Sequence, residues 1–302
     1  MLIIRKIPSV SAQAEAHQYC APVSVSLADL PTPTNDNATS SDVQKKRRAP
    51  RRVSLLADRQ FLNEYKALRG IAPVQAGVSG IVGRSYAPTH SLPAFMTKAP
   101  RPWSSATDET KAHFGLEALQ ALGSVVAFTV WASQKISDRA YATGAPLPWL
   151  RKRVAEALNN ALGPIEWLAS IEEEWKDGTP RLHFHGALIL DNPSRRRLVR
   201  ARQALRCALG SWAGEAMKRQ VKLKLDPDCG WASYLGKRTW LALPGIRDRF
   251  ACARPGSPWR LSFDGPVLTM TNGIRALAKE LHQQAREAVQ EARQRATATE
   301  SP

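Results

Sequence analysis

Apolar and polar positions follow regular patterns from about residue 115 onward, and these patterns predict strands and helices. β-branched and aromatic residues are frequent in 123–133, which predicts a strand, and residues 165–174 return to strand character. Between them, residues 148–162 carry apolar side chains at a spacing of four, which predicts one amphipathic helix that ends at Gly163. Strand and helix patterns therefore alternate in the second half of the chain.

A β-hairpin is predicted in the middle of this region. The strand over 165–174 is followed by the turn residues Asp177, Gly178 and Pro180, and the apolar stretch LHFHGALIL (182–190) then resumes a strand pattern. Two strands joined by so short a turn pair as antiparallel neighbours. We therefore expect the two strands to lie side by side.

Beyond the hairpin the chain again mixes helix and strand patterns. We predict a helix over 194–217, a strand over 220–226, a helix containing WASYLGKRTWLA (231–242) and a last helix that starts near residue 272. This mixture indicates the α+β class, with a mainly antiparallel central sheet covered by helices.

The first third of the chain differs in composition. It is rich in Pro, Ser, Thr, Ala and charge, and it includes the basic run KKRRAPRR at 45–52. Apart from a short helix predicted over 55–70, apolar residues do not recur regularly, so we expect a flexible region that cannot bury enough apolar surface to offset its ordering entropy. The predicted organisation is a flexible basic region over 1–112, a domain over 113–250, and a C-terminal strand and helix extension over 251–302.

The net charge of the chain points to a polyanionic partner. The formal charge is +17 and the pI is about 10.2, and Lys and Arg that neutralise phosphates release counterions on binding. Nucleic acid is therefore the expected partner, and the basic run at 45–52 either contacts it or is a solvated charge cluster.

Other global features exclude several classes of protein. The four cysteines are scattered without CxxC spacing, so neither a disulfide framework nor a zinc site is expected. No apolar run approaches the ~18 residues of a membrane helix. Arg5 and Lys6 follow the first apolar residues instead of preceding them, so no secretory signal is expected. We expect a cytoplasmic protein without membrane association.

Two histidines stand two positions apart in the second hairpin strand. Residues i and i+2 of a strand face the same side, so His183 and His185 can chelate one divalent metal. The alternative is that both are polar residues on the solvent face of the sheet. The first hairpin strand ends in Glu172, Glu173 and Glu174, and a hairpin brings a carboxylate back toward the histidines. A set of two histidines and one carboxylate leaves open positions for substrate oxygens.

A tyrosine and a lysine share one face of the predicted helix that follows the strand over 220–226. Tyr234 and Lys237 are three positions apart, and this spacing places them side by side. Such a pair is often a lysine packed along an aromatic ring. Beside a metal-bound phosphate, however, the phenol can act as a nucleophile and the lysine can position the phosphate.

Three segments resemble, in their order, the three motifs of HUH endonucleases, and more narrowly those of rolling-circle replication initiators from plasmids and phages. They are the strand VVAFTV, the strand PRLHFHGALIL and the segment VKLKLDPDCGWASYLGK. His183, Phe184 and His185 match the His-hydrophobic-His motif. Tyr234 and Lys237 match the single-tyrosine YxxK motif. The resemblance covers roughly residues 120–250.

This resemblance implies an HUH endonuclease fold and a nickase that acts on single-stranded or hairpin origin DNA. Mg²⁺ or Mn²⁺ would be held by His183, His185 and a third side chain. Tyr234 would attack the phosphate, remain linked to the 5′ end and leave a 3′-OH, with Lys237 beside it. A position counted back from the turn glycine favours Glu173 as the third ligand, whereas strand parity keeps Glu172 or Glu174 open. No helicase domain is present, so a host helicase and polymerase are the expected partners.

Further contacts with DNA and two other functions remain open. A single-tyrosine transposase of the same superfamily shares the motifs, and a non-catalytic DNA-binding protein with a degenerate site would serve copy control or packaging. A second tyrosine is not expected in the site, because the nearest one is Tyr141. Unpaired bases could stack on Trp103, Trp231, Trp240 or Trp259, although core packing accounts for each singly. The candidate DNA-binding residues are Arg195, Arg196, Arg197, Arg200, Lys237 and Arg238, with a solvated helix face as the alternative for the first four.

Overall fold

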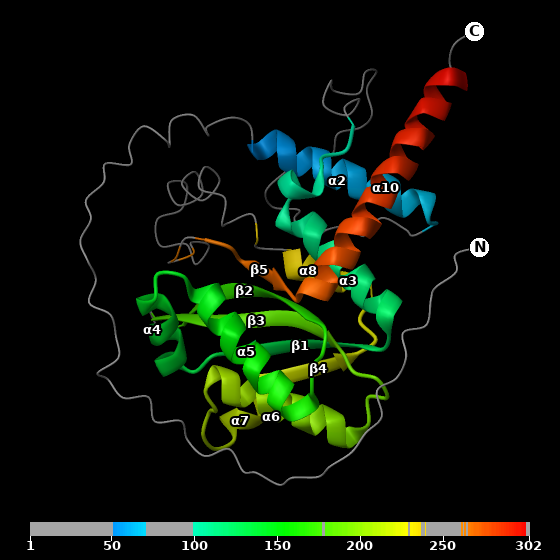
Figure 1. The fold of residues 1–302 in the computed structure, drawn as a ribbon. Coiled ribbons are helices and arrows are strands. Elements are labelled where there is room, and N and C mark those ends of the chain that lie inside the picture. Colours follow the sequence, from blue (N-terminus) through cyan, green and yellow to red (C-terminus); the bar gives the residue numbers. More distant parts are fainter. Residues whose placement is uncertain are drawn as a thin grey trace, which may run out of the picture. The chain divides into compact units, whose positions relative to one another are not determined.

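The computed structural model describes residues 51–70, 99–176, 179–228, 230–236 and 265–299, together with Thr239, Leu261 and Phe263. Within these residues the core is an open five-stranded sheet in the order β4-β1-β3-β2-β5, and every neighbouring pair is antiparallel (Figure 1). The predicted α+β class with an antiparallel sheet covered by helices is confirmed. The strands are β1 (Val125–Trp131), β2 (Trp167–Lys176), β3 (Thr179–Ile189), β4 (Val221–Leu225) and β5 (Leu268–Met270).

The helices of the described ranges flank this sheet and extend beyond it. None of them combines the length and the apolar content that a bilayer crossing requires. They are α2 (Arg51–Leu68), η2 (Trp103–Ser105), α3 (Asp108–Leu122), α4 (Gln134–Ala142), α5 (Pro146–Leu162), α6 (Arg195–Leu209), α7 (Ala216–Gln220), α8 (Gly230–Gly236) and α10 (Asn272–Thr299).

One predicted helix is shorter than its pattern indicated. The sequence predicts a helix over 194–217, and the side chain of Ser194 caps its start by accepting from the backbone N–H of Arg197. The helix ends at Leu209, because Gly210 adopts a φ of +76°. A Cβ at that position would lie 2.3 Å from Ser133 Oγ, so only glycine fits there. The chain then leaves the helix and forms α7.

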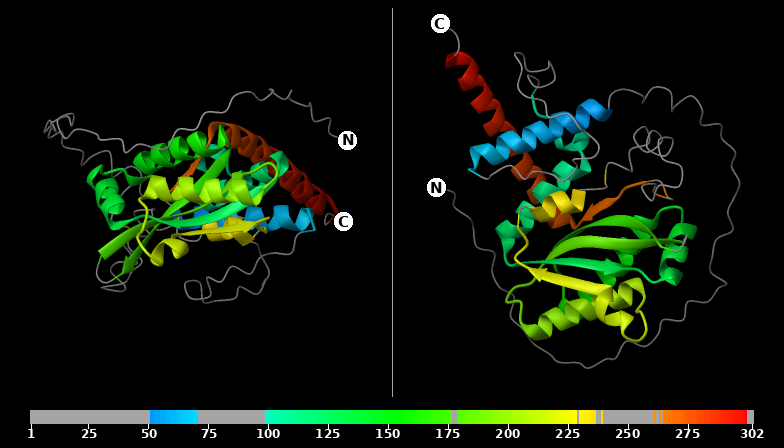
Figure 2. Two further views of the ribbon diagram at one scale, coloured as in Figure 1. Left: turned by 90° about the horizontal axis from the view of Figure 1, so that it is seen from below. Right: turned by 180° about the vertical axis from the view of Figure 1, so that it is seen from behind.

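Alternation along the strands divides the sheet into two differently covered faces (Figures 1 and 2). On one, the α5 face, Phe128, Trp167 and Phe184 pack against apolar residues of α4, α5 and α6. On the other, the α8 face, Leu168 and Ala187 pack with residues of α3, α8 and α10. On this face α3 contacts β2, β3 and β5, and α8 contacts β2.

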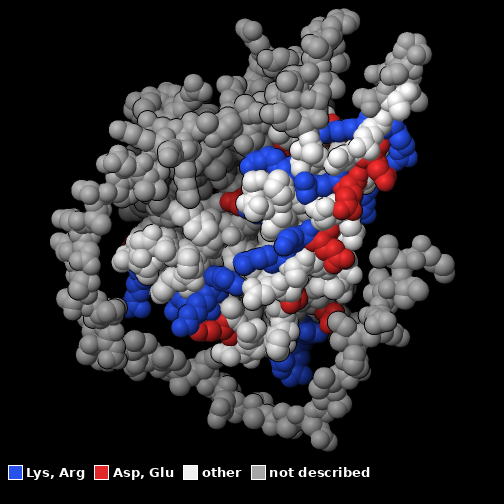
Figure 3. All heavy atoms as spheres, turned by 45° about the horizontal axis from the view of Figure 1, so that its top comes forward, with Lys and Arg blue, Asp and Glu red and all other residues white. Residues whose placement is uncertain are grey.

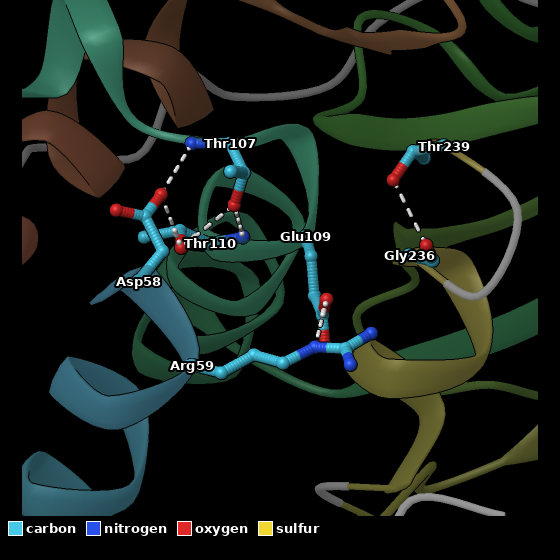
Figure 4. A network of polar contacts seen from close by, with 7 residues as sticks. All are labelled: Asp58, Arg59, Thr107, Glu109, Thr110, Gly236 and Thr239. Atoms are coloured by element: carbon cyan, nitrogen blue, oxygen red, sulfur yellow. Dashed lines mark hydrogen bonds and ion pairs between the residues drawn. The ribbon is translucent and has the colours of Figure 1, made fainter. Parts of the chain in front are cut away.

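The folded body begins earlier than the predicted boundary at residue 112. Phe61 of α2 is buried in the same cluster as Phe114 of α3. Asp58 Oδ2 accepts hydrogen bonds from Thr107 N at 2.6 Å and from Thr110 Oγ1 at 3.2 Å (Figure 4). The short helix predicted over 55–70 is present as α2, whereas the expectation of flexibility was wrong for residues 99–112, since the sequence does not reveal the surface against which this segment and α2 pack. Residues 1–50 and 71–98 lie outside the described residues.

The predicted C-terminal extension also contributes to the main sheet. β5 pairs with β2, with Leu268 opposite Ser170. α10 then returns over the α8 face, where Ile274 and Ala278 are buried. The extension over 251–302 is therefore part of the folded body in its described portion.

A buried histidine makes the stability of this body sensitive to pH. His282 of α10 is 1% exposed and lies with its ring centroid 5.1 Å from that of Phe114 and 5.5 Å from those of Phe61 and Trp103. Burial, reinforced by the cations Arg286 and Lys111, lowers the pKa of His282 to about 4.

The unfolded chain therefore binds more protons than the folded one between about pH 6.5 and 4. The contribution of neutral His282 is fully present above about pH 6.5 and is lost as the pH falls, by about 2 kcal/mol at pH 5. We expect the His282→Phe variant to lose about 2 kcal/mol less unfolding free energy than the wild type between pH 7.5 and pH 5, measured by urea denaturation. Equal pH dependence of the two proteins would contradict this prediction.

Candidate metal centre

Three side chains that could ligate a metal meet on the α8 face of the sheet. The register places Glu172 of β2 directly opposite His183 of β3, and His185 lies two positions further along the same strand. His183 Nε2 lies 3.2 Å from Glu172 Oε2, and His185 Nε2 lies 3.4 Å from the same oxygen. Water has little access to these side chains, since the exposed fractions are 2% for Glu172, 6% for His183 and 1% for His185.

The cluster fits a single divalent cation. Each of the three residues offers one ligand atom, and all three atoms lie within 4.8 Å of one another. A cation about 2.1 Å from each neighbouring ligand separates those ligands by roughly 3.0–3.5 Å. The two nitrogen–oxygen distances, 3.2 and 3.4 Å, fall in this range. Two imidazoles and one carboxylate form a donor set suited to a divalent metal with open coordination positions.

A threonine of the neighbouring strand orients one of the histidines. Thr129 of β1 pairs with His185, and its Oγ1 lies 2.9 Å from His185 Nδ1. When His185 binds a metal through Nε2, Nδ1 carries the hydrogen and donates it to Thr129. The sequence alone does not single out Thr129, because its position beside His185 depends on the register between β1 and β3.

The predicted third ligand, Glu173, is not part of the cluster. Glu173 pairs with Leu182, so its side chain lies on the α5 face, where it accepts a hydrogen bond from Tyr141 Oη at 3.0 Å. The prediction of Glu173 was wrong because adjacent residues of a strand point to opposite faces. Of the two alternatives that parity left open, Glu172 completes the cluster. Glu174 is exposed and accepts a hydrogen bond from Trp131 Nε1 at 3.2 Å.

The predicted nucleophile lies beside this cluster. The Tyr234 ring of α8 has its centroid 4.6 Å from that of His185, at an interplanar angle of 80°. Trp231 stacks on Tyr234 with centroids 4.9 Å apart, and its Nε1 donates to Gly186 O of β3 at 3.1 Å. Trp231 therefore fixes the tyrosine helix on the sheet, in agreement with the packing role considered from the sequence.

Glycines allow close packing on both faces of the sheet. On the α5 face, a Cβ at Gly186 would lie 2.2 Å from Phe128 Cζ, so the aromatic ring occupies the space of a side chain. A Cβ at Gly236, the end of α8, would lie 3.0 Å from Glu109 Cα of α3. Glu109 in turn pairs with Arg59 of α2 at 3.1 Å (Figure 4). The helix that carries Tyr234 is thus supported by α3, and α3 by α2.

The other described tyrosines do not lie in the cluster. Tyr141 contacts Glu173 on the α5 face, and burial together with the Glu173 charge raises its pKa above the ordinary tyrosine value. Tyr65 of α2 donates a hydrogen bond to Glu117 at 2.8 Å. Among the tyrosines that the structure describes, Tyr234 is the one whose ring contacts a cluster histidine.

The remaining candidate residues are placed elsewhere or lie outside the described residues. The buried side of α6 packs on the α5 face, so its arginines are not brought to the metal cluster. The face shown in Figure 3 carries a diagonal row of Lys and Arg with Asp and Glu groups beside it, so basic charge is not uniform there. Lys237 and Arg238 lie outside the described residues. The α6 candidates are Arg195, Arg196, Arg197 and Arg200, and all but the half-buried Arg197 are exposed.

Comparisons with protein-family models, with curated proteins and with solved structures found no match to this chain. The function of this chain is therefore inferred from the motifs in its sequence and from the geometry of the cluster. That geometry places the ring of Tyr234 beside a candidate site for a divalent cation.

Proposed function

We propose that this chain is a single-tyrosine DNA nickase of the HUH type that initiates rolling-circle replication. The observation that carries the proposal is the contact between the Tyr234 ring and His185, one of three side chains that could hold a cation. Bound by Glu172, His183 and His185, Mg²⁺ or Mn²⁺ would polarise the scissile phosphate and offset the charge that develops in the transition state.

In this proposal, the chain's own residues supply the nucleophile and its orientation. Tyr234 Oη attacks the scissile phosphorus and forms a bond to the 5′ phosphate. The bond from phosphorus to the 3′ oxygen breaks, the 3′ oxygen takes up a proton, and the phenol loses one to solvent. Trp231 holds the tyrosine helix on β3, and Lys237 would position the phosphate. Attack by a 3′-OH on the phosphotyrosine reverses the reaction and rejoins the strand.

The net charge and the product of the reaction indicate the partners. A charge of +17 favours a strand of DNA, single-stranded or extruded as a hairpin at an origin. The 3′-OH released by the nick is a primer, so a host polymerase and helicase would carry replication onward. Nicking, rather than unwinding or synthesis, is the step assigned to this chain.

The proposal is tested with labelled single-stranded oligonucleotides that tile both strands of the replicon encoding the chain. With Mn²⁺ we expect one oligonucleotide to give a protein-linked 5′ product and a fragment that a polymerase can extend, and with EDTA we expect neither. The degenerate-site alternative predicts binding that is indifferent to EDTA and yields no adduct, and that result would refute the nickase. A single-tyrosine transposase would cleave at the ends of a mobile element, so the mapped position separates it from an initiator.

A further inference from the structure

A second candidate site adjoins the metal centre at the end of β1. It is a pocket of about 610 Å³ at the junction of β1, β3, β4 and the segment between α6 and α7. Two indole rings and three cations contribute to its walls, and none of the described residues that line it is acidic. The five are Trp131, Arg181, Trp212, Arg219 and Lys222.

This pocket begins next to the candidate metal ligands. Trp131 pairs with His183 across β1 and β3, and their ring centroids are 6.0 Å apart. Lys222 of β4 pairs with Thr129, and its Nζ lies 5.3 Å from the centre of the Trp131 ring. Trp131 therefore contacts the metal cluster and also forms a wall of the pocket.

A buried glutamine holds the two tryptophans of the pocket in place. Gln220 at the end of α7 is fully buried. Its Oε1 accepts from Trp212 N at 3.0 Å, and its Nε2 donates to Trp131 O at 3.0 Å and to Gly210 O at 2.8 Å. Arg181 is held as well, because its Nε donates to Gln134 Oε1 at 3.3 Å. Hydrogen bonds within the chain therefore hold the backbone of both tryptophans and the side chain of Arg181 at this pocket.

We infer that this pocket receives one unpaired nucleotide of the DNA strand, next to the nucleotide whose phosphate is cleaved. The inference rests on the proposed function and adds a subsite to it. The indole rings of Trp131 and Trp212 offer faces for one base. Arg181, Arg219 and Lys222 offer charges for the phosphates on either side of that base. A volume of about 610 Å³ is within the range of pockets that hold ligands of this size.

The subsite is tested by measuring DNA binding in EDTA, so that binding is read without cleavage. The probes are the cleaved oligonucleotide and a series in which each nucleotide in turn is abasic. For the wild-type chain we expect one abasic position beside the scissile phosphate to weaken binding about tenfold. In the Trp212→Ala variant this position should no longer matter, whereas Trp212→Phe, which keeps an aromatic face, should restore most of the effect.

Charge at the pocket is tested with two matched variants of α7. Arg219 lines the pocket, whereas Lys218 does not and is paired with Glu215 at 2.9 Å on the exposed surface. We expect Arg219→Ala to reduce the slope of log K against log salt by about 0.7, the value for one phosphate contact on a single strand. Lys218→Ala should leave both the slope and the abasic pattern as in the wild type.

The possible results separate the subsite from the nickase. An abasic pattern that is identical in the wild type and in Trp212→Ala would overturn the subsite even if the protein still forms its covalent adduct. Absence of the adduct from the wild type would overturn the proposed function instead. Competition by a deoxynucleoside monophosphate at the affinity of the whole oligonucleotide would reassign the pocket to free nucleotides and would also overturn the subsite.

Discussion

Replacement of Tyr234 by Phe is expected to abolish the covalent protein–DNA adduct and to lower nicking by about 10³-fold or more. The variant removes only the phenolic oxygen that would form the bond to phosphorus. Its ring can still stack on Trp231 and contact His185, so the cluster should keep its shape. The measurement is a denaturing gel of the labelled oligonucleotide after incubation with Mn²⁺.

The matched control for this variant is Tyr141→Phe. Tyr141 donates to Glu173 on the α5 face, away from the metal cluster, so its loss should cost about 1 kcal/mol of stability and leave the adduct intact. DNA binding in EDTA should be retained by both variants. An adduct that survives Tyr234→Phe, or that disappears from a folded Tyr141→Phe variant, would show that the nucleophile has been misassigned.

Local sequence patterns predicted most of the elements that build the site. The strands predicted over 123–133 and 165–174 correspond to β1 and β2, and the strand predicted around the histidines corresponds to β3. The rule that residues i and i+2 share a strand face put His183 and His185 on one side of the sheet, as observed. These predictions succeed because they depend on neighbours along the chain and on one short hairpin.

The third member of the cluster differs from the predicted one by one residue, and register explains the difference. A hairpin with two residues between its strands would pair Lys176 with Thr179, which is the register observed. Four pairs further from the turn, Glu172 lies opposite His183. A position counted from the turn glycine along one strand alone gave Glu173, and a shift of one residue moves a side chain to the opposite face.

Contacts between distant segments could not be predicted from local patterns. The packing of α2 on α3 depends on Asp58 meeting the start of a helix 49 positions later. The pocket depends on Gln220, which joins Gly210 and Trp212 to a backbone carbonyl of β1. Neither arrangement leaves a periodic signal in the sequence, because each arises only when several elements are already assembled.

The clearest test of the metal centre compares two adjacent glutamates. We expect Glu172→Gln to weaken Mn²⁺ binding by more than about 100-fold, since loss of an outer-shell partner alone often costs 10–100-fold. Glu173→Gln should bind Mn²⁺ as the wild type does, because its side chain lies on the opposite face and its amide oxygen can still accept the hydrogen bond from Tyr141. Calorimetric titration of the full chain with Mn²⁺, without DNA, measures both affinities.

Thermal unfolding provides a second measurement that is independent of nicking. A cation bound only by the folded chain stabilises it by about 2.7 kcal/mol when its concentration is 100 times the dissociation constant. The wild type and Glu173→Gln should therefore melt at higher temperature in Mn²⁺ than in EDTA, whereas Glu172→Gln should show no such difference. The opposite result would be a melting temperature that rises in Mn²⁺ for Glu172→Gln but not for Glu173→Gln. The cation would then lie on the α5 face. Tyr234 could not be its partner in catalysis, because Tyr234 contacts His185 on the α8 face.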